Sequence, residues 1–143
     1  MKISARNVFE GQVVAIKEGP VSAEVDIVLP TGETLVAAIT EGSVHSLGLR
    51  PGLSVMAFVK APLVLLATDT AGWRFSARNQ LAGTVSQVQR GAVNASVQVR
   101  LAGGAEISAI ITHGAVDELA LAPGLPVTAL FKAGSVLLGV KDA

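Results

Sequence analysis

An internal repeat constrains the fold of this chain more than any other feature of its sequence. Shifting the 143-residue sequence by 72 positions aligns it with itself without a gap. The run Ser-Ala-Arg-Asn at residues 4–7 then falls on the same run at 76–79, and Lys-Ala at 60–61 falls on Lys-Ala at 132–133. A repeat of this kind indicates that one structural unit occurs twice in the chain.

Both repeats carry the pattern of β-strands. Apolar residues occupy every second position from 21 to 29, and again from 93 to 101, which is the period of a strand with one buried face. Turn-forming residues follow at 30–32 and 102–104. Further strands are expected in the first repeat at residues 11–16, 34–39, 53–59 and 64–67.

A single short helix is expected between the third and fourth strands, over residues 41–47. Val44 and Leu47 lie three positions apart, so they share one face of such a helix. Thr40 is placed to cap its start, and Arg-Pro-Gly at residues 50–52 stops it.

Five short strands and one small helix suggest a Greek-key barrel of the OB type. The predicted fold class is therefore all-β, with two tandem OB-like β-barrels that each hold one short helix. We place the first domain at residues 1–70 and the second at residues 73–143. A domain of about 70 residues buries only about 60% of the surface that its unfolded chain exposes. The copies are therefore expected to pack together, and the chain to form a homo-oligomer.

Composition excludes several classes of function. The sequence has no cysteine, and its two histidines, His45 and His113, share no ligand-like spacing, so a zinc site is not expected and both should lie at the surface. Eleven basic residues balance eleven acidic ones and aromatic residues are scarce, which argues against nucleic-acid binding. No run reaches the roughly 20 apolar residues that span a membrane, and residues 1–7 lack the apolar core of a signal peptide. A cytoplasmic location is therefore expected.

The polar residues that recur in both copies indicate what the chain binds. Five identities between the copies carry a polar or charged side chain: Ser4, Arg6, Asn7, Thr40 and Lys60, matched by Ser76, Arg78, Asn79, Thr112 and Lys132. Both repeated charges are positive, and no acid is repeated that could serve as a catalytic base, so enzymatic activity is not expected. Hydroxyls, an amide and cations are the donors that an anion site requires.

Each repeat combines a helix-starting threonine (Thr40, Thr112) with a strand-ending lysine (Lys60, Lys132). Free backbone N–H groups at a helix start favour an oxyanion, and a lysine ammonium supplies a compact positive charge. A site made of donors suits a fully deprotonated dianion, because a protonated ligand needs an acceptor. Taken singly, each residue is explained as a cap, a turn or a solvated charge. Their joint recurrence favours anion binding.

These runs resemble the Mop domain of molybdate-binding proteins. The resemblance rests on the repeated Ser-Ala-Arg-Asn and Lys-Ala runs, on Gly11, on Ile-Thr at 39–40, and on Gly-Ala-Val-Asn-Ala at 91–95. It covers essentially the whole chain, and two such domains in tandem resemble the di-Mop molbindins. The resemblance implies OB-like barrels that bind molybdate or tungstate in the cytoplasm, for storage or homeostasis. It also implies rings of six Mop domains, so that a tandem chain forms a homotrimer.

The resemblance further implies which residues hold the oxyanion, at contacts between domains and without direct side-chain ligands to the metal. One class of site is implied at Ser4, Arg6, Thr40, Ser43, Lys60, Ala61, Ser76, Arg78, Thr112, Lys132 and Ala133. A second class, near the three-fold axis, is implied at Gly19, Val21, Ser22, Gly91, Val93 and Asn94. The first class is expected to act largely through backbone N–H groups.

The two copies depart from one another at several of these positions. Ser43 is matched by Ala115, which removes one hydroxyl donor from one version of the site. The first copy has Gly-Pro-Val-Ser at 19–22 where the second keeps the family's Gly-Ala-Val-Asn, and Gly134 stands where many family members have serine or threonine. Sites of unequal affinity are therefore expected.

Two alternatives to an anion store stay open. One is a molybdate-sensing regulatory or partner-binding module without catalytic activity, related to the ligand domains of molybdate-responsive regulators and transporter ATPases. Such proteins carry a helix-turn-helix or a P-loop, and neither pattern occurs in this sequence. The other is an OB-fold nucleic-acid binder, which the neutral charge and the few aromatic residues disfavour.

Overall fold

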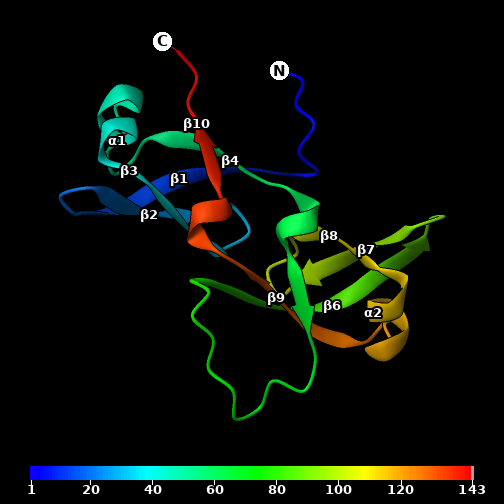
Figure 1. Cartoon of the computed structure of the whole chain (residues 1–143). Helices are drawn as coiled ribbons and strands as arrows, with labels where there is room; N and C mark the ends of the chain where they lie inside the picture. The colour runs from blue at the N-terminus through cyan, green and yellow to red at the C-terminus, as the bar shows by residue number, and fades with distance from the viewer. Residues whose placement is uncertain (143) are drawn as a thin grey trace. The chain divides into compact units, whose positions relative to one another are not determined.

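A computed structural model describes residues 1–142 of the chain, which form two compact units (Figure 1). Residues 1–59 make one unit together with the chain from Lys132 onward, and Lys60–Phe131 make the other. Each unit contains one five-stranded antiparallel sheet. The prediction of an all-β protein with one short α-helix in each repeat is confirmed.

The first unit has the sheet order β10-β4-β1-β2-β3. Its elements are β1 (Asn7–Glu18), β2 (Ser22–Val28), β3 (Thr34–Thr40), α1 (Glu41–Leu47), β4 (Ser54–Val59), the 3₁₀ turn η2 (Ala133–Ser135) and β10 (Leu137–Gly139). The edge strands β3 and β10 contact each other, so the sheet curls towards a closed barrel.

The second unit repeats this arrangement with the order β5-β9-β6-β7-β8. Its elements are η1 (Ala61–Leu63), β5 (Leu65–Ala67), β6 (Asn79–Arg90), β7 (Asn94–Leu101), β8 (Glu106–Thr112), α2 (His113–Glu118) and β9 (Pro126–Phe131). Here β5 and β8 are the edge strands that contact each other. The predicted tandem of barrel-like sheets is therefore present.

The compact units do not coincide with the two sequence repeats, because the repeats exchange their last strand. β10 comes from the second repeat but pairs with β4 of the first, with Leu138 opposite Ala57 (Figure 1). Conversely, β5 of the first repeat pairs with β9 of the second, with Leu66 opposite Ala129. Each unit thus takes four strands and a helix from one repeat and its fifth strand from the other. The repeat limits of 1–70 and 73–143 describe the sequence rather than these compact units.

The buried core residues follow the alternation that the sequence predicts for the strands. Along β2, Ala23, Val25 and Ile27 are buried, and the residues between them are only partly buried. The long strand β1 continues past the predicted residues 11–16 and shifts its register against β2 between Val13 and Ala15. Such a shift bends a strand and allows one sheet to curl.

The helix expected at residues 41–47 is present with those bounds. The Thr40 side chain accepts a hydrogen bond from the Ser43 backbone N–H, as predicted for an N-cap. Its end is set earlier than the Arg-Pro-Gly run: Gly48 adopts the left-handed conformation with φ of 63° and donates to the His45 carbonyl. Within residues 1–142, no helix is long and apolar enough to cross a membrane.

Candidate functional site

The strand register places the two repeated cations of each copy at one end of a strand pair. Asn7 pairs with Val59, so Arg6 and Lys60 each lie one residue beyond the last paired positions. In the second copy Asn79 pairs with Phe131, which places Arg78 and Lys132 in the same relation. The sequence-predicted Ser-Ala-Arg-Asn and Lys-Ala runs are therefore neighbours in the register, although more than fifty positions separate them in the chain.

The members of the Ser-Ala-Arg-Asn run have different roles. Asn7 and Asn79 are the buried polar residues, with 3% and 1% of their surface exposed, so they belong to the framework of the sheet. Ser4 and Arg6 are exposed, as are their counterparts in the second copy. Only these exposed side chains are available to an anion from solvent.

The Lys-Ala runs form the entrance to short 3₁₀ turns. Lys60 is exposed and precedes η1, whereas Ala61 is fully buried, so Ala61 offers a ligand its backbone rather than its side chain. The equivalent Lys132 and Ala133 precede and begin η2 in the same way.

Because the last strands are exchanged, each 3₁₀ turn lies in the same compact unit as the threonine of the other repeat. η2 contacts β3, the strand that ends at Thr40, so Lys132 and Ala133 share a unit with Thr40. η1 contacts β8, which ends at Thr112, so Lys60 and Ala61 share a unit with that residue. In each unit, therefore, the lysine and the threonine come from different repeats.

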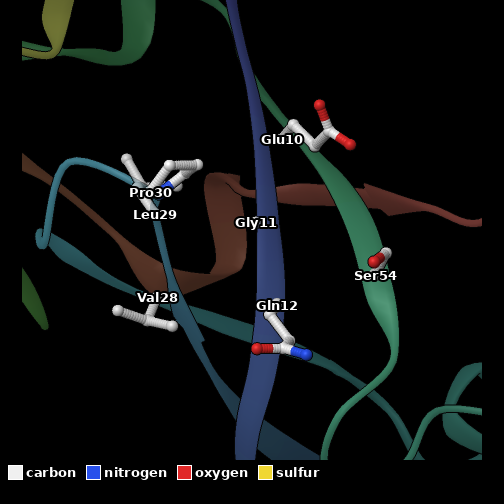
Figure 2. Close-up of a pocket in the computed structure, with 7 residues that line it drawn as sticks. All are labelled: Glu10, Gly11, Gln12, Val28, Leu29, Pro30 and Ser54. Carbon is white, nitrogen blue, oxygen red and sulfur yellow. The ribbon is translucent and has the colours of Figure 1, made fainter.

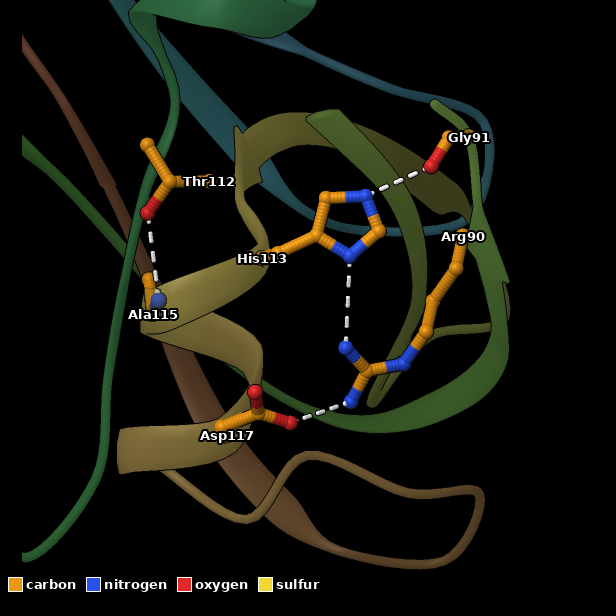
Figure 3. Close-up of polar contacts among 6 residues, drawn as sticks. All are labelled: Arg90, Gly91, Thr112, His113, Ala115 and Asp117. Carbon is orange, nitrogen blue, oxygen red and sulfur yellow. Dashed lines mark hydrogen bonds and ion pairs between the residues drawn. The ribbon is translucent and has the colours of Figure 1, made fainter. Parts of the chain in front are cut away.

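The two threonines differ in their local partners. Thr40 accepts the Ser43 N–H at 3.1 Å, and its Oγ1 also lies 2.8 Å from the Ser43 Oγ. Thr112 accepts the Ala115 N–H at 3.1 Å (Figure 3), and Ala115, which stands where the first copy has Ser43, carries no hydroxyl. The first copy thus presents a pair of hydroxyls at its helix start and the second copy presents one.

The residues predicted for the second class of site form a tight loop beside this helix start. The Gly19 N–H donates to the Ser22 carbonyl at 2.9 Å, and the Glu41 N–H donates to the Val21 carbonyl at 3.1 Å. Ser22 pairs with Thr40 across the β2–β3 ladder. The structure therefore brings the loop 19–22 and the helix start together, although sequence analysis assigned them to separate classes of site.

In the second copy a network of polar side chains surrounds the equivalent loop, which contains Gly91, Val93 and Asn94. His113 Nε2 lies 2.6 Å from the Gly91 carbonyl oxygen, and its Nδ1 lies 3.4 Å from Arg90 (Figure 3). Arg90 also donates to Asp117 at 2.6 Å. Sequence analysis missed this network because none of its side chains is repeated, and His113 was expected only to lie at the surface.

Two surface hollows lie away from all the predicted binding residues. One is lined by Glu10, Gly11, Gln12, Val28, Leu29, Pro30 and Ser54 (Figure 2). Its counterpart is lined by Ala82, Gly83, Thr84, Arg100, Leu101 and Ala102. Each is lined by a glycine, Gly11 or Gly83, whose backbone lies so close to the neighbouring strand that a Cβ would come within 2.5–2.6 Å of it. Glu10 makes the hollow beside Gly11 unsuited to an anion. We attribute both hollows to the close approach of strands rather than to ligand binding.

Comparison with known proteins places the chain in a family. Residues 3–66 and residues 76–138 each match the family model of the TOBE domain. The chain belongs to the TOBE domain family. The two matches follow the sequence repeats, not the strand-exchanged units, as expected for a comparison that reads sequence.

Several curated relatives match nearly the whole of this chain. The molybdenum transport protein ModE of Herbaspirillum seropedicae is 45% identical over 99% of this chain, and the molybdenum-pterin-binding protein MopA of Rhodobacter capsulatus is 43% identical over 98%. The chain spans about half the length of these curated relatives, 53% in both.

A solved structure covers the TOBE domain pair from end to end. It is the cytoplasmic molybdate-binding protein ModG with molybdate bound, which is 55% identical, covers 99% of this chain and 100% of its own, and has a TM-score of 0.94. The resemblance to tandem molybdate-binding Mop-domain proteins is confirmed by these matches.

Proposed function

We propose that this TOBE domain pair binds molybdate as the intact oxyanion. The observation that carries the proposal is the fold it shares over its whole length with a molybdate-bound protein that is 55% identical. The doubled set of exposed donors supports it independently, because the register brings Arg6 and Lys60 to one end of a strand pair, and Arg78 and Lys132 to the same end in the second copy.

We assign the first class of binding site to the residues that sequence analysis singled out. Lys60 and Lys132 provide positive charge, and the backbone at Ala61 and Ala133 provides N–H donors from buried, well-fixed positions. The threonine hydroxyls complete the set where the helices start. Such fixed donors satisfy a dianion without the large entropy cost of ordering long side chains.

We assign the second class of site to the loops at residues 19–22 and 91–94. In both loops the first glycine N–H bonds within the loop, which fixes its shape before a ligand arrives. The exposed Val21 and Val93 flank the binding face. Because the residues around the two loops differ in charge, we expect these sites to differ in affinity.

The physiological role that fits a binding protein of this kind is storage or homeostasis of molybdenum in the cytoplasm. We propose that tungstate, which has the same tetrahedral shape and charge, binds as well. We further propose a homotrimer, because sites formed by donors from several domains are complete only in an assembly. The role requires no catalysis, and the repeated residues include no general base.

Equilibrium dialysis of the purified chain against molybdate tests the proposal, with bound molybdenum measured by mass spectrometry. Removing both site lysines with K60M/K132M is expected to lower affinity by roughly 10- to 100-fold, since a hydrogen bond to a charged group contributes about 1.5–3 kcal/mol. The control K17M removes an exposed lysine outside the site and should leave binding unchanged. Equal retention by wild type and K60M/K132M would reject the assigned lysines, and no retention by wild type would reject the function.

A second candidate function is a sensor module. It is favoured by the match to regulators, such as the transcriptional regulator ModE of Yersinia pestis, which is 37% identical over 96% of this chain. This chain covers 52% of that protein. A protein partner captured from cell extract only when molybdate is present would favour this role over storage.

A further inference from the structure

Three side chains with metal-binding atoms converge at one corner of the first unit. One ligand atom from each of Glu18, Glu41 and His45 lies within 4.8 Å of the others. The His45 Nε2 is 3.1 Å from Glu41 Oε1. None of the three belongs to the oxyanion-binding residues assigned above.

The fold brings these residues together from positions far apart in the chain. Glu18 ends β1 and pairs with Ala23 across the first hairpin. Ser22, the neighbour of Ala23, pairs with Thr40, which directly precedes Glu41. His45 follows one helical turn later, so it faces the same side of α1 as Glu41.

One carboxylate oxygen at this corner has no partner among residues 1–142, although the other oxygen of Glu41 contacts His45. Glu41 is well shielded, with 23% of its side chain exposed, and its Oε2 is buried without a hydrogen-bond partner among residues 1–142. A buried carboxylate oxygen without a partner is costly in a native protein and calls for an explanation such as an ion. His45 is 73% exposed, so an ion can reach the corner from solvent.

The second repeat provides an internal comparison at the same three positions. Glu18, Glu41 and His45 correspond to Arg90, His113 and Asp117 by the 72-residue shift. There the Arg90 guanidinium lies between the other two, 2.6 Å from Asp117 and 3.4 Å from His113 (Figure 3). The second copy thus supplies its own cation at the corner, whereas the first copy replaces that cation with a second carboxylate.

We propose that Glu18, Glu41 and His45 form a binding site for a divalent transition-metal ion. Two carboxylates and one imidazole neutralise a doubly charged ion and suit zinc better than magnesium, because imidazole favours zinc whereas magnesium prefers oxygen ligands alone. Ligands about 2.1 Å from a shared zinc lie roughly 3–4 Å apart, so small rotations of the exposed Glu18 side chain complete the set. Water fills the remaining positions.

The site is separate from the proposed oxyanion function, although Glu18 directly precedes the loop 19–22. Its test therefore uses zinc alone and no molybdate. Untagged protein, freed of metal with a chelator, is titrated with zinc chloride by calorimetry, and the retained zinc is counted after gel filtration. A failure to bind molybdate leaves this measurement unaffected.

The matched variant transfers the side chains of the second repeat into the first. E18R/E41H/H45D places at this corner a set that the same fold already accommodates, and we expect it to retain one zinc ion fewer per chain than wild type. The variant E18Q/H45N, which keeps the shapes of the side chains, should lose the same ion. H113N, in the second copy, should retain as much zinc as wild type.

The reverse transfer tests whether the three positions are sufficient. R90E/H113E/D117H, which places the side chains of the first repeat at this corner of the second, is expected to bind one more zinc ion per chain. Equal zinc binding by wild type, E18R/E41H/H45D and E18Q/H45N, each confirmed as folded by circular dichroism, would overturn the proposal.

Discussion

The Oγ1 of Thr40 lies 2.8 Å from the Oγ of Ser43, and this hydroxyl pair has no equivalent in the second repeat. Thr112 keeps the capping hydrogen bond to the backbone of residue 115, but that residue is alanine. Both helices therefore keep the same N-cap hydrogen bond, and the two helix starts differ in one hydroxyl, that of Ser43. We propose that this hydroxyl faces the oxyanion.

This hydroxyl should affect affinity more than stability. S43A leaves the backbone N–H that Thr40 accepts, so the helix cap persists. Loss of one hydrogen bond of about 1 kcal/mol predicts roughly fivefold weaker molybdate binding at the sites that contain Ser43. Titration calorimetry should show the decrease, and A115S should strengthen the sites of the other copy. A change in melting temperature without a change in affinity would contradict this assignment.

The closely packed glycines give a prediction about stability. A Cβ on Gly83 would lie 2.6 Å from the carbonyl oxygen of Arg100, which belongs to the paired strand and cannot move without disturbing the ladder. G83A should therefore lower the free energy of unfolding by about 1–3 kcal/mol, the usual cost of overpacking. Urea denaturation measures the loss.

Gly134 provides the control for that substitution. A Cβ there would meet no atom within 4 Å, so G134A should change the free energy of unfolding little. Equal stability of G83A and G134A would show that the β6–β7 contact is looser than the structure describes.

The ends of the two helices give a matched pair of substitutions. Gly48 ends α1 with φ of 63°, and the residue at the same position in the second repeat, Ala120, adopts φ of 51°. A side chain in this left-handed region costs about 1–2 kcal/mol. A120G should therefore stabilise the protein by up to about 1 kcal/mol, because the gain is offset by the flexibility of glycine when unfolded. G48A should destabilise it by a similar amount, and thermal unfolding of the two variants in parallel should give shifts of opposite sign.

The sequence predicted the secondary structure well because its signals are local. The alternation from residue 21 to 29 predicts which face of β2 is buried. Thr40 predicts the start of α1 because a threonine side chain can cap a helix start through a local hydrogen bond, whatever the tertiary structure around it. The Arg-Pro-Gly run at residues 50–52 predicts the end of α1, whereas Gly48 already ends the helix in the structure.

The exchange of the last strands was not predictable from these patterns. β5 and β10 are both three residues long and both begin with Leu-Leu, so either strand fits either sheet by local preference. Which sheet each strand joins depends on the path of the chain after Val59 and after Phe131. That path depends on packing between residues that are distant in the sequence, and the local periodicity of apolar residues carries no information about such contacts.

The side-chain clusters beside the loops were missed for a related reason. The polar identities between the copies predicted the binding residues, whereas Glu18 and Arg90 occupy one position with opposite charges. Residues that differ between the repeats are those that make the two copies chemically distinct. Only the pairing of β1 with β2 and of β2 with β3, repeated by β6 with β7 and β7 with β8, shows that Glu18 and Arg90 each lie near a helix start.

Isothermal titration of molybdate into the purified chain, repeated with sulfate and phosphate in excess, tests the central claim most directly. The proposed function predicts tight binding that survives excess sulfate, with more than one anion bound per chain. Absence of binding heat together with no molybdenum retained on dialysis would contradict it, and would leave the repeated donors as features of the fold alone.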